Sequence, residues 1–442
     1  MSSRACGVAR LSGKRALTSA QPLPTIDGIE RPRSDGYVWL PSFMRILMIA
    51  PEPFFEPRGT PFSEYHRIRA LLELGHTVDL VTYPFGQGVD LPGLRVFRCV
   101  RPPFLHRVGI GPSLPKVPLD LSLTLTAVRR VLAERYDVIH SHEEGAAIGI
   151  VLSAALRIPH VYDMHSSLPQ QLSNFAYSRS TVLRWIFDHF ERAAVRHSKV
   201  VIVICPELRR IVQEVQPGIE PVLIENAPGA GDAAPEGTAV AVRATLGVMP
   251  STPLVVYTGT FEAYQGLDLL FAAAALVIEA RPDARFLLAG GRPEQVATAR
   301  AQAAAEGLDT SVIFMGERPS AEIPDILEAA DVLVSPRSRG TNTPLKIYQY
   351  LRSGRAIVAT RLLTHTQVLD DSVAILTGAS PREFADGILA ALADPQMAAS
   401  IAARAAELAA TKYSYDMYLE RTREVMARLT SAARAQAAGV VA

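Results

Sequence analysis

Residues 335–360 read Ser-Pro-Arg-Ser-Arg-Gly-Thr-Asn-Thr-Pro-Leu-Lys-Ile-Tyr-Gln-Tyr-Leu-Arg-Ser-Gly-Arg-Ala-Ile-Val-Ala-Thr, a pattern typical of a loop, a helix and a strand. Short apolar runs at 332–334 and 356–359 predict buried strands on either side of the helix. Thr343 is predicted as the N-cap and Pro344 as the first helical residue, where the missing N–H of proline costs nothing. Gly354 is predicted to end the helix, because glycine readily adopts the left-handed conformation.

The start of this helix has the chemistry of an anion site. A helix that opens at the carboxyl end of a strand presents unpaired N–H groups and partial positive charge there. Lys346 and Gln349 share a face of its first turns, and Arg337 and Arg339 stand in the preceding loop. These features predict a phosphate-binding site. The alternative is an ordinary strand–loop–helix unit with solvated arginines.

The composition excludes several classes of protein. The chain has 442 residues, enough for two or three domains, and a formal net charge of +1, which argues against a nucleic-acid partner. Its three cysteines give neither a disulfide framework nor metal-ligand spacing and favour a reducing compartment. No apolar run reaches the roughly 18–20 residues that a spanning helix needs. We therefore expect a soluble, cytoplasmic protein, with peripheral contact at the inner face of a membrane left open.

The order of patterns along the chain predicts two domains. Residues 1–43 lack periodicity, and we expect a disordered extension without function, with Met44 as a candidate true start. Residues 44–228 and 238–414 each alternate short apolar strands with amphipathic helices, a pattern typical of a parallel sheet covered on both faces. The segment 227–237, rich in Ala, Gly and Pro, predicts a linker. Residues 415–442 come last, as a largely helical segment.

This organisation predicts an α/β fold of two doubly wound, Rossmann-like parallel-sheet domains that face a cleft. Ligands of such sheets bind beyond the carboxyl ends of the strands. The loop that precedes Lys346 comes directly after a predicted strand of the second domain. The predicted anion site would therefore border the cleft.

Several separate stretches, in order, resemble the retaining glycosyltransferases of family 4, which have the two-domain GT-B fold. Residues 257–270 (Tyr-Thr-Gly-Thr-Phe-Glu-Ala-Tyr-Gln-Gly-Leu-Asp-Leu-Leu) are similar to that family's strand, Gly-Arg turn, Lys-Gly pair and helix. Residues 286–291 resemble its next strand and glycine turn, and residues 312–316 and 330–336 resemble the approach to its signature loop. Residues 353–360 match the family pattern on the C-terminal side of that loop.

The resemblance covers essentially 44–429 and implies a role for each part. Residues 44–228 would form the acceptor domain and residues 238–414 the domain that binds the nucleotide-sugar donor, with 415–442 crossing back to the first domain. The implied donor contacts from the second domain are Thr260, Gln265, Gly266, Arg337, Thr341, Asn342, Thr343 and Gln349. In the first domain, Gly59 matches a glycine whose backbone amide lies near the donor phosphate; a plain turn before a helix is the alternative.

The sequence departs from the family pattern at four positions. The two glutamates of the signature align with Thr341 and Gln349, and the usual arginine and lysine align with Thr260 and Gln265. A glutamine can still hydrogen-bond to ribose hydroxyls, while Arg337, Arg339 and Lys346 can supply positive charge from the other loop. An altered but working site is the favoured interpretation, and a non-catalytic member of the family is the alternative.

His165 and Lys346 are the predicted catalytic residues. His165, in Tyr-Asp-Met-His-Ser-Ser, resembles the family histidine near the transferring sugar, although a histidine after a strand is often structural. His140 and His142 are two apart and face the same way, which favours cleft lining or packing over a metal site. The resemblance implies transfer of a sugar to an acceptor hydroxyl with retention, in polysaccharide, glycolipid or glycoside biosynthesis, with no metal or other cofactor.

Two other functions stay open at this point. One is a nucleotide-sugar epimerase on the same fold, and the other is a non-catalytic nucleotide-sugar-binding or scaffold protein. The expected partners are a nucleotide-sugar donor and a carbohydrate, lipid-linked or small-molecule acceptor. The aromatic and basic stretches around Phe104, Leu105, Val108 and residues 184–187 would suit a membrane surface, but core packing with a solvated face is the preferred interpretation.

Overall fold

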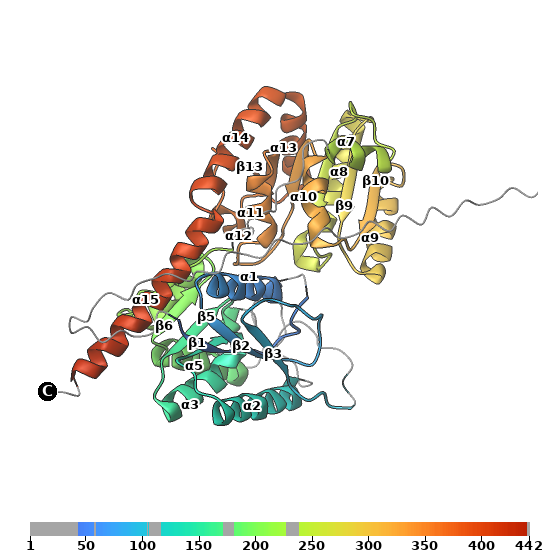
Figure 1. The fold of residues 1–442 in the computed structure, drawn as a ribbon. Coiled ribbons are helices and arrows are strands. Elements are labelled where there is room, and N and C mark those ends of the chain that lie inside the picture. Colours follow the sequence, from blue (N-terminus) through green and yellow to red (C-terminus); the bar gives the residue numbers. More distant parts are fainter. Residues whose placement is uncertain are drawn as a thin grey trace, which may run out of the picture. The chain divides into compact units, whose positions relative to one another are not determined.

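The computed structural model describes residues 43–56, 59–103, 105, 116–170, 181–226 and 238–439, and the side chains of 431–439 are not among them. The expectations for residues 1–42 and for the linker 227–237 lie outside this range. Two parallel sheets with helices on both faces make up the fold (Figure 1), and both belong to one compact unit of the chain. The predicted fold class is confirmed.

The first sheet has seven strands in the order β3-β2-β1-β4-β5-β6-β7, all parallel. Its central strands are buried along their length, as expected when helices cover both faces. The strands are β1 Arg45–Ala50, β2 Thr77–Thr82, β3 Leu94–Arg98, β4 Val138–His142, β5 His160–Met164, β6 Val200–Val203 and β7 Val222–Leu223. The helices are α1 Gly59–Glu73, α2 Lys116–Ala133, α3 Ala146–Leu156, α5 Thr181–His197 and α6 Pro206–Val215.

The second sheet has six parallel strands in the order β10-β9-β8-β11-β12-β13. They are β8 Leu254–Thr258, β9 Arg285–Ala289, β10 Val312–Gly316, β11 Val332–Ser335, β12 Ala356–Thr360 and β13 Ile375–Thr377. Their covering helices are α7 Thr238–Thr245, α8 Leu267–Ala280, α9 Pro293–Ala305, α10 Ile323–Glu328, α11 Leu345–Arg352, α12 Leu363–Thr366, α13 Pro381–Ala393 and α14 Pro395–Thr411.

The strand order of the second sheet indicates where a ligand would bind. In this sheet the order reverses between β8 and β11, since β8 leads towards β9 on one side and β11 towards β12 on the other. The loops at the carboxyl ends of these two strands are the β8–α8 loop and the β11–α11 loop. A crevice between such diverging loops is where ligands of open α/β sheets bind.

Helices α6 and α7 are elements that the sequence pattern did not predict. Helix α6 begins with Pro206 at a first-turn position, directly after Cys205 in an extended conformation. Proline at a helix start is a recognisable signal.

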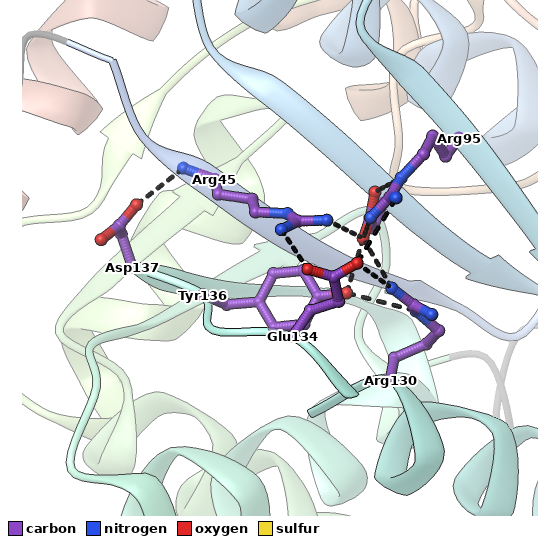
Figure 2. Close-up of polar contacts among 7 residues, drawn as sticks. Arg45, Arg95, Arg130, Glu134, Tyr136 and Asp137 are labelled. Atoms are coloured by element: carbon purple, nitrogen blue, oxygen red, sulfur yellow. Dashed lines mark hydrogen bonds and ion pairs between the residues drawn. The ribbon is translucent and has the colours of Figure 1, made fainter. Parts of the chain in front are cut away.

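A network of charged side chains holds the C-terminal part of α2 against the amino ends of the first sheet's strands (Figure 2). Asp79 in β2 is 2% exposed and accepts hydrogen bonds from Arg95 Nε at 2.7 Å and from the hydroxyl of Tyr136 at 2.6 Å. Arg45 and Arg130 also lie within 3.4 Å of the same carboxylate. Because it lies at the amino edge of the sheet, this network stabilises the domain away from the candidate site.

The final helix, α15 (Tyr415–Gly439), packs on the first sheet's elements α1, β6 and β7. Its Thr422 hydroxyl accepts a hydrogen bond from Arg67 of α1, and the Tyr418 ring lies 5.0 Å from that guanidinium. Within the described part of the chain, we find no helix long and apolar enough to span a membrane.

Candidate functional site

The candidate site begins where β11 leads into α11. Pro344 is the N-cap residue, with φ −65° and ψ 136°, and no side-chain cap is seen among the described residues. The prediction that Thr343 caps the helix is therefore wrong, because Pro344 keeps its fixed φ but takes an extended ψ, so the helix begins one residue later. Gly354 has φ +67° and comes just after the last helical turn, as predicted.

Lys346, in the first turn of α11, is a buried cation. Its side chain is 8% exposed, and Nζ has no hydrogen-bond partner among the described residues. Nζ lies 3.8 Å from the centroid of the Tyr257 ring, which supplies a cation–π contact. Burial, and then the charge of Arg337, lower the pKa of Lys346 well below its usual range. The site therefore disfavours the lysine charge until an anion compensates for it.

Arg337, in the β11–α11 loop, is a second cation and is half-buried. Its Nη1 donates to the backbone oxygen of Asn342 and to the hydroxyl of Thr364, both at 2.8 Å. Its guanidinium lies 4.9 Å from the centre of the Tyr264 ring, while Nε has no partner among the described residues. Burial lowers the pKa of this arginine. Arg337 thus stabilises the loop through Nη1, while its Nε–H has no hydrogen-bond partner among the described residues.

The same loop is tied to elements of the first sheet. The amide of Asn342 donates to the backbone oxygen of His165 at 2.7 Å, and the Thr341 hydroxyl donates to the side-chain oxygen of Gln170 at 3.0 Å. Gln367 donates to the Thr341 backbone oxygen at 2.6 Å. The structure thus brings Asn342 and His165, both predicted site residues, together.

His165 stands just beyond β5 in a buried array of three histidines and one carboxylate. Its Nε2 lies 3.0 Å from His142 Nδ1 and 3.3 Å from Asp163 Oδ1. His140 Nε2 lies 3.2 Å from Asp163 Oδ2, and Arg67 Nε donates to that oxygen at 2.9 Å. The residues come from the carboxyl ends of β4 and β5, where alternate positions face the same way.

Burial and neighbouring charges together set the protonation of this array. Desolvation alone would raise the pKa of Asp163, but the charges of Arg67 and His165 hold it well below its usual range. Desolvation lowers the pKa of His140 and, more strongly, that of His142. Asp163 is therefore a permanent anion behind His165, with His140 and His142 as neutral hydrogen-bonding groups.

Two family models match the chain. The model described as glycosyl transferase 4-like domain matches residues 65–227, and the model described as glycosyl transferases group 1 matches residues 252–394. The chain belongs to glycosyltransferase family 4. The predicted family and GT-B fold are confirmed, and the protein acts in sugar transfer for glycoside biosynthesis.

Relatives of this glycosyltransferase support the assignment. Phosphatidyl-myo-inositol mannosyltransferase of Mycolicibacterium smegmatis is 26% identical over 381 residues, which cover 82% of this chain and 89% of the relative. D-inositol 3-phosphate glycosyltransferase of Corynebacterium urealyticum is 28% identical, covering 78% and 85%.

Solved structures share the fold. Sucrose-phosphate synthase from Thermosynechococcus elongatus matches with a TM-score of 0.73 at 20% identity, over 88% of this chain and 100% of that one. Anabaena HepE, solved in complex with UDP-glucose, matches with a TM-score of 0.67 at 19% identity, over 87% and 99%.

In this glycosyltransferase, the two residues that replace the family's arginine and lysine bind each other. Gln265 Nε2 donates to the Thr260 hydroxyl at 3.3 Å, and the Tyr257 hydroxyl donates to the Thr260 backbone oxygen at 2.7 Å. The Gln265 side-chain oxygen is buried and has no partner among the described residues. A neutral, hydrogen-bonding pair thus stands where the family pattern has two cations.

Two predicted glycines have different roles. Gly266 has φ +75°, and a Cβ there would lie 2.0 Å from the Pro336 backbone oxygen, so glycine is needed to bring the β8–α8 and β11–α11 loops together. Gly59, the first residue of α1, has φ +49°, and a Cβ built there meets no atom of the described residues within 4 Å. Its backbone is therefore open to approach, as a phosphate contact would require.

Thr343, Gln349 and Arg339 are the remaining residues that the sequence placed at the site. Thr343 is buried, with its hydroxyl oxygen unpartnered among the described residues. Gln349 is half-buried on α11, and Arg339 is exposed.

Nitrogen and oxygen atoms of His140, His142 and Asp163 lie within 4.8 Å of one another, the spacing of a metal site. The guanidinium of Arg67 already occupies the Asp163 carboxylate and would repel a cation there. We therefore assign these side chains to a hydrogen-bonded array that orients His165.

Sequence reasoning missed Tyr257, Asp163 and Arg67. Asp163 stands two residues before His165, so alternation along a strand could have paired them. Arg67 lies on the buried face of α1, and a charged residue there signals a buried partner. For Tyr257 no local signal exists, because its contact with Lys346 joins strand β8 to helix α11, which are far apart in the sequence.

Proposed function

We propose that this glycosyltransferase binds the diphosphate of a nucleotide-sugar donor at the start of α11, against Lys346 and Arg337. The observation that carries the proposal is that neither the buried Lys346 nor the half-buried Arg337 has a carboxylate partner among the described residues. A diphosphate would compensate both charges and accept hydrogen bonds from Lys346 Nζ and Arg337 Nε. The free N–H groups of the first helical turn add to this attraction.

The remaining donor contacts are inferred from unpartnered or open groups. The side-chain oxygen of Gln265 can accept a hydrogen bond from a donor hydroxyl, and Gln349 can reach ribose hydroxyls from the same helix face as Lys346. The open backbone of Gly59 suits a phosphate oxygen. The UDP-glucose complex of HepE supports a nucleoside-diphosphate sugar as the kind of donor.

Retention at the anomeric carbon is proposed to proceed on one face of the sugar. The positions of the signature glutamates hold Thr341 and Gln349, so they offer no carboxylate nucleophile or acid of the kind that retaining glycosidases use. The departing diphosphate would instead accept the proton of the acceptor hydroxyl as the new bond forms. Lys346 would stabilise the negative charge that develops on the diphosphate, while His165, held by Asp163 and His142, would contact the transferring sugar.

No metal is needed in this proposal. The charge that a divalent cation would supply to a leaving diphosphate comes here from Lys346 and Arg337. The acceptor would be a carbohydrate, a lipid-linked sugar or polyol, or a small glycoside, bound by the first domain in the cytoplasm. The relatives that act on inositol-containing acceptors support a polyhydroxylated acceptor.

Thermal unfolding in the presence of uridine-, guanosine-, adenosine- and thymidine-diphosphate sugars tests the donor site. One donor class should raise the Tm by several degrees, because a ligand at 100 times its Kd adds about 2.7 kcal/mol of stability. The matching free sugar is the control and should leave the Tm unchanged. The donor site is wrong if none of the four classes shifts the Tm. Conversion of the donor sugar without any glycosylated product would favour the epimerase alternative.

A further inference from the structure

Helix α2 exposes a second apolar face. Its buried residues, Leu119, Leu123 and Ala127, pack against the first sheet. On its other side, four large apolar side chains are between 52% and 81% exposed: Val117, Leu121, Leu125 and Leu132. Their spacing of four, four and seven residues keeps them on one stripe of the helix. A helix that is apolar on two faces normally contacts something on both.

Helix α5 carries a second patch of the same kind. Val182, Trp185 and Ile186 are 66%, 59% and 46% exposed, and Trp185 and Ile186 follow Val182 by three and four residues. The preferred interpretation of this stretch as core with a solvated face is therefore wrong for Trp185 and Ile186. Leu105, in the other stretch considered, is buried, while Phe104 and Val108 lie outside the described residues.

The two helices lie on the same face of the first sheet. The connections that contain α2, α3 and α5 all step in one direction along the strand order, and parallel crossovers are right-handed, so they share a face. Helix α3 contacts both α2 and α5, and Figure 1 shows the three helices together on the lower side of the first sheet. Val151 of α3 is 65% exposed and continues the patch between them.

The charges on this face are basic. The exposed charged side chains of α5 are Arg184, Arg192 and Arg196, whereas its acidic residues are half-buried (Asp188) or buried (Glu191). Helix α3 contains no charged residue and leads into exposed Arg157, and α2 adds exposed Arg129. Exposed aliphatic side chains, a tryptophan and arginines together match the boundary between the acyl chains and the anionic headgroups of a lipid bilayer.

We propose that the docking face formed by α2, α3 and α5 binds the surface of a membrane that contains anionic phospholipids. The apolar side chains enter the headgroup region, and the arginines contact lipid phosphates. This inference does not depend on the donor site, since it concerns a different face of the first domain. It gives the transferase access to acceptors or products that stay in a membrane.

Co-sedimentation with vesicles tests the proposal. Vesicles of phosphatidylcholine and phosphatidylglycerol in equal amounts should bind the full chain, and vesicles of phosphatidylcholine alone should bind it at least tenfold more weakly. The double variant Leu121→Glu/Trp185→Glu should lose at least tenfold in partitioning onto the anionic vesicles. The matched control Val240→Glu/Met249→Glu, which places the same charges at exposed apolar positions of the second domain, should bind like the wild type.

The outcomes separate the alternatives. Circular dichroism and thermal unfolding establish that each variant is folded, which exposed positions should allow. The proposal is overturned if neither vesicle binds, or if both double variants bind alike. It is equally overturned if sedimentation equilibrium shows a wild-type dimer that Leu121→Glu/Trp185→Glu dissociates while neither vesicle binds, since the occupant would then be a second copy of the chain.

Discussion

Replacing Lys346 by methionine should lower kcat by about 10²–10³-fold, the loss seen when one preorganised donor to a developing oxyanion is removed. Methionine keeps much of the volume next to the Tyr257 ring but cannot donate a hydrogen bond or carry charge. Because Nζ has no partner among the described residues, the substitution breaks no described hydrogen bond. The variant should therefore be at least as stable as the wild type at neutral pH.

The lowered pKa of Lys346 allows the Lys346→Met prediction to be tested in a second way. Burial and Arg337 lower the pKa of Lys346, and a bound diphosphate would raise it again, so donor binding should take up a proton. Since the unfolded lysine holds its proton more tightly, the stability gained in the variant should be largest at low pH and vanish above the lysine's ordinary pKa of about 10.4.

Calorimetry in buffers of different ionisation enthalpy measures the proton uptake, and steady-state assays measure kcat. Lys412→Met is the matched control, because Lys412 is exposed. It should leave both quantities unchanged. A Lys346→Met enzyme that keeps full turnover but unfolds at a much lower temperature would show that the lysine is structural.

Replacing Asp163 by asparagine should destabilise the protein by about 3–5 kcal/mol, the cost of leaving a buried charge without its partner. Arg67 is 2% exposed and Asp163 is fully buried, so water cannot replace the lost carboxylate. Activity should also fall, because His165 loses the anion that orients its ring. Urea unfolding of the wild type and variant measures the difference.

The stability that Asp163 contributes depends on pH. The folded pKa of Asp163 lies well below the ordinary carboxyl value of about 3.9, so its contribution is complete above that value and is lost as the pH falls through the folded pKa. The double variant Arg67→Met/Asp163→Asn should recover much of the lost stability, because the orphaned charge is gone. Asp283→Asn, at an exposed ion pair, is the control and should change stability by less than about 0.5 kcal/mol. A loss below about 1 kcal/mol for Asp163→Asn would contradict the buried pair.

The fold was predictable because strong local patterns agreed with the global architecture. The alternation of apolar strands and amphipathic helices recurs on both sides of residues 227–237, and parallel sheets require it. Local sequence signals were less successful in predicting where helices and strands begin and end. At the start of α11, Pro344 fits both a first helical residue and an extended N-cap, and only the surrounding loop decides between them.

The site was less predictable because its main contacts join distant parts of the chain. The chemistry of Lys346 and Arg337 could be recognised locally, but the Tyr257 ring next to Lys346 comes from β8 and the Tyr264 ring beside Arg337 from the β8–α8 loop. Thr260 and Gln265 were recognised as departures from the family pattern. Their mutual hydrogen bond needed the structure, since it depends on how the β8–α8 loop closes.

The anomeric configuration of the product tests the central claim most directly. Once a donor and an acceptor have been found, proton NMR of the first-formed product should show the same configuration at the transferred sugar as in the donor. Lys346→Met should form that product much more slowly. Inversion at this carbon, or equal rates for the wild type and Lys346→Met, would contradict same-face transfer from a diphosphate held at the start of α11.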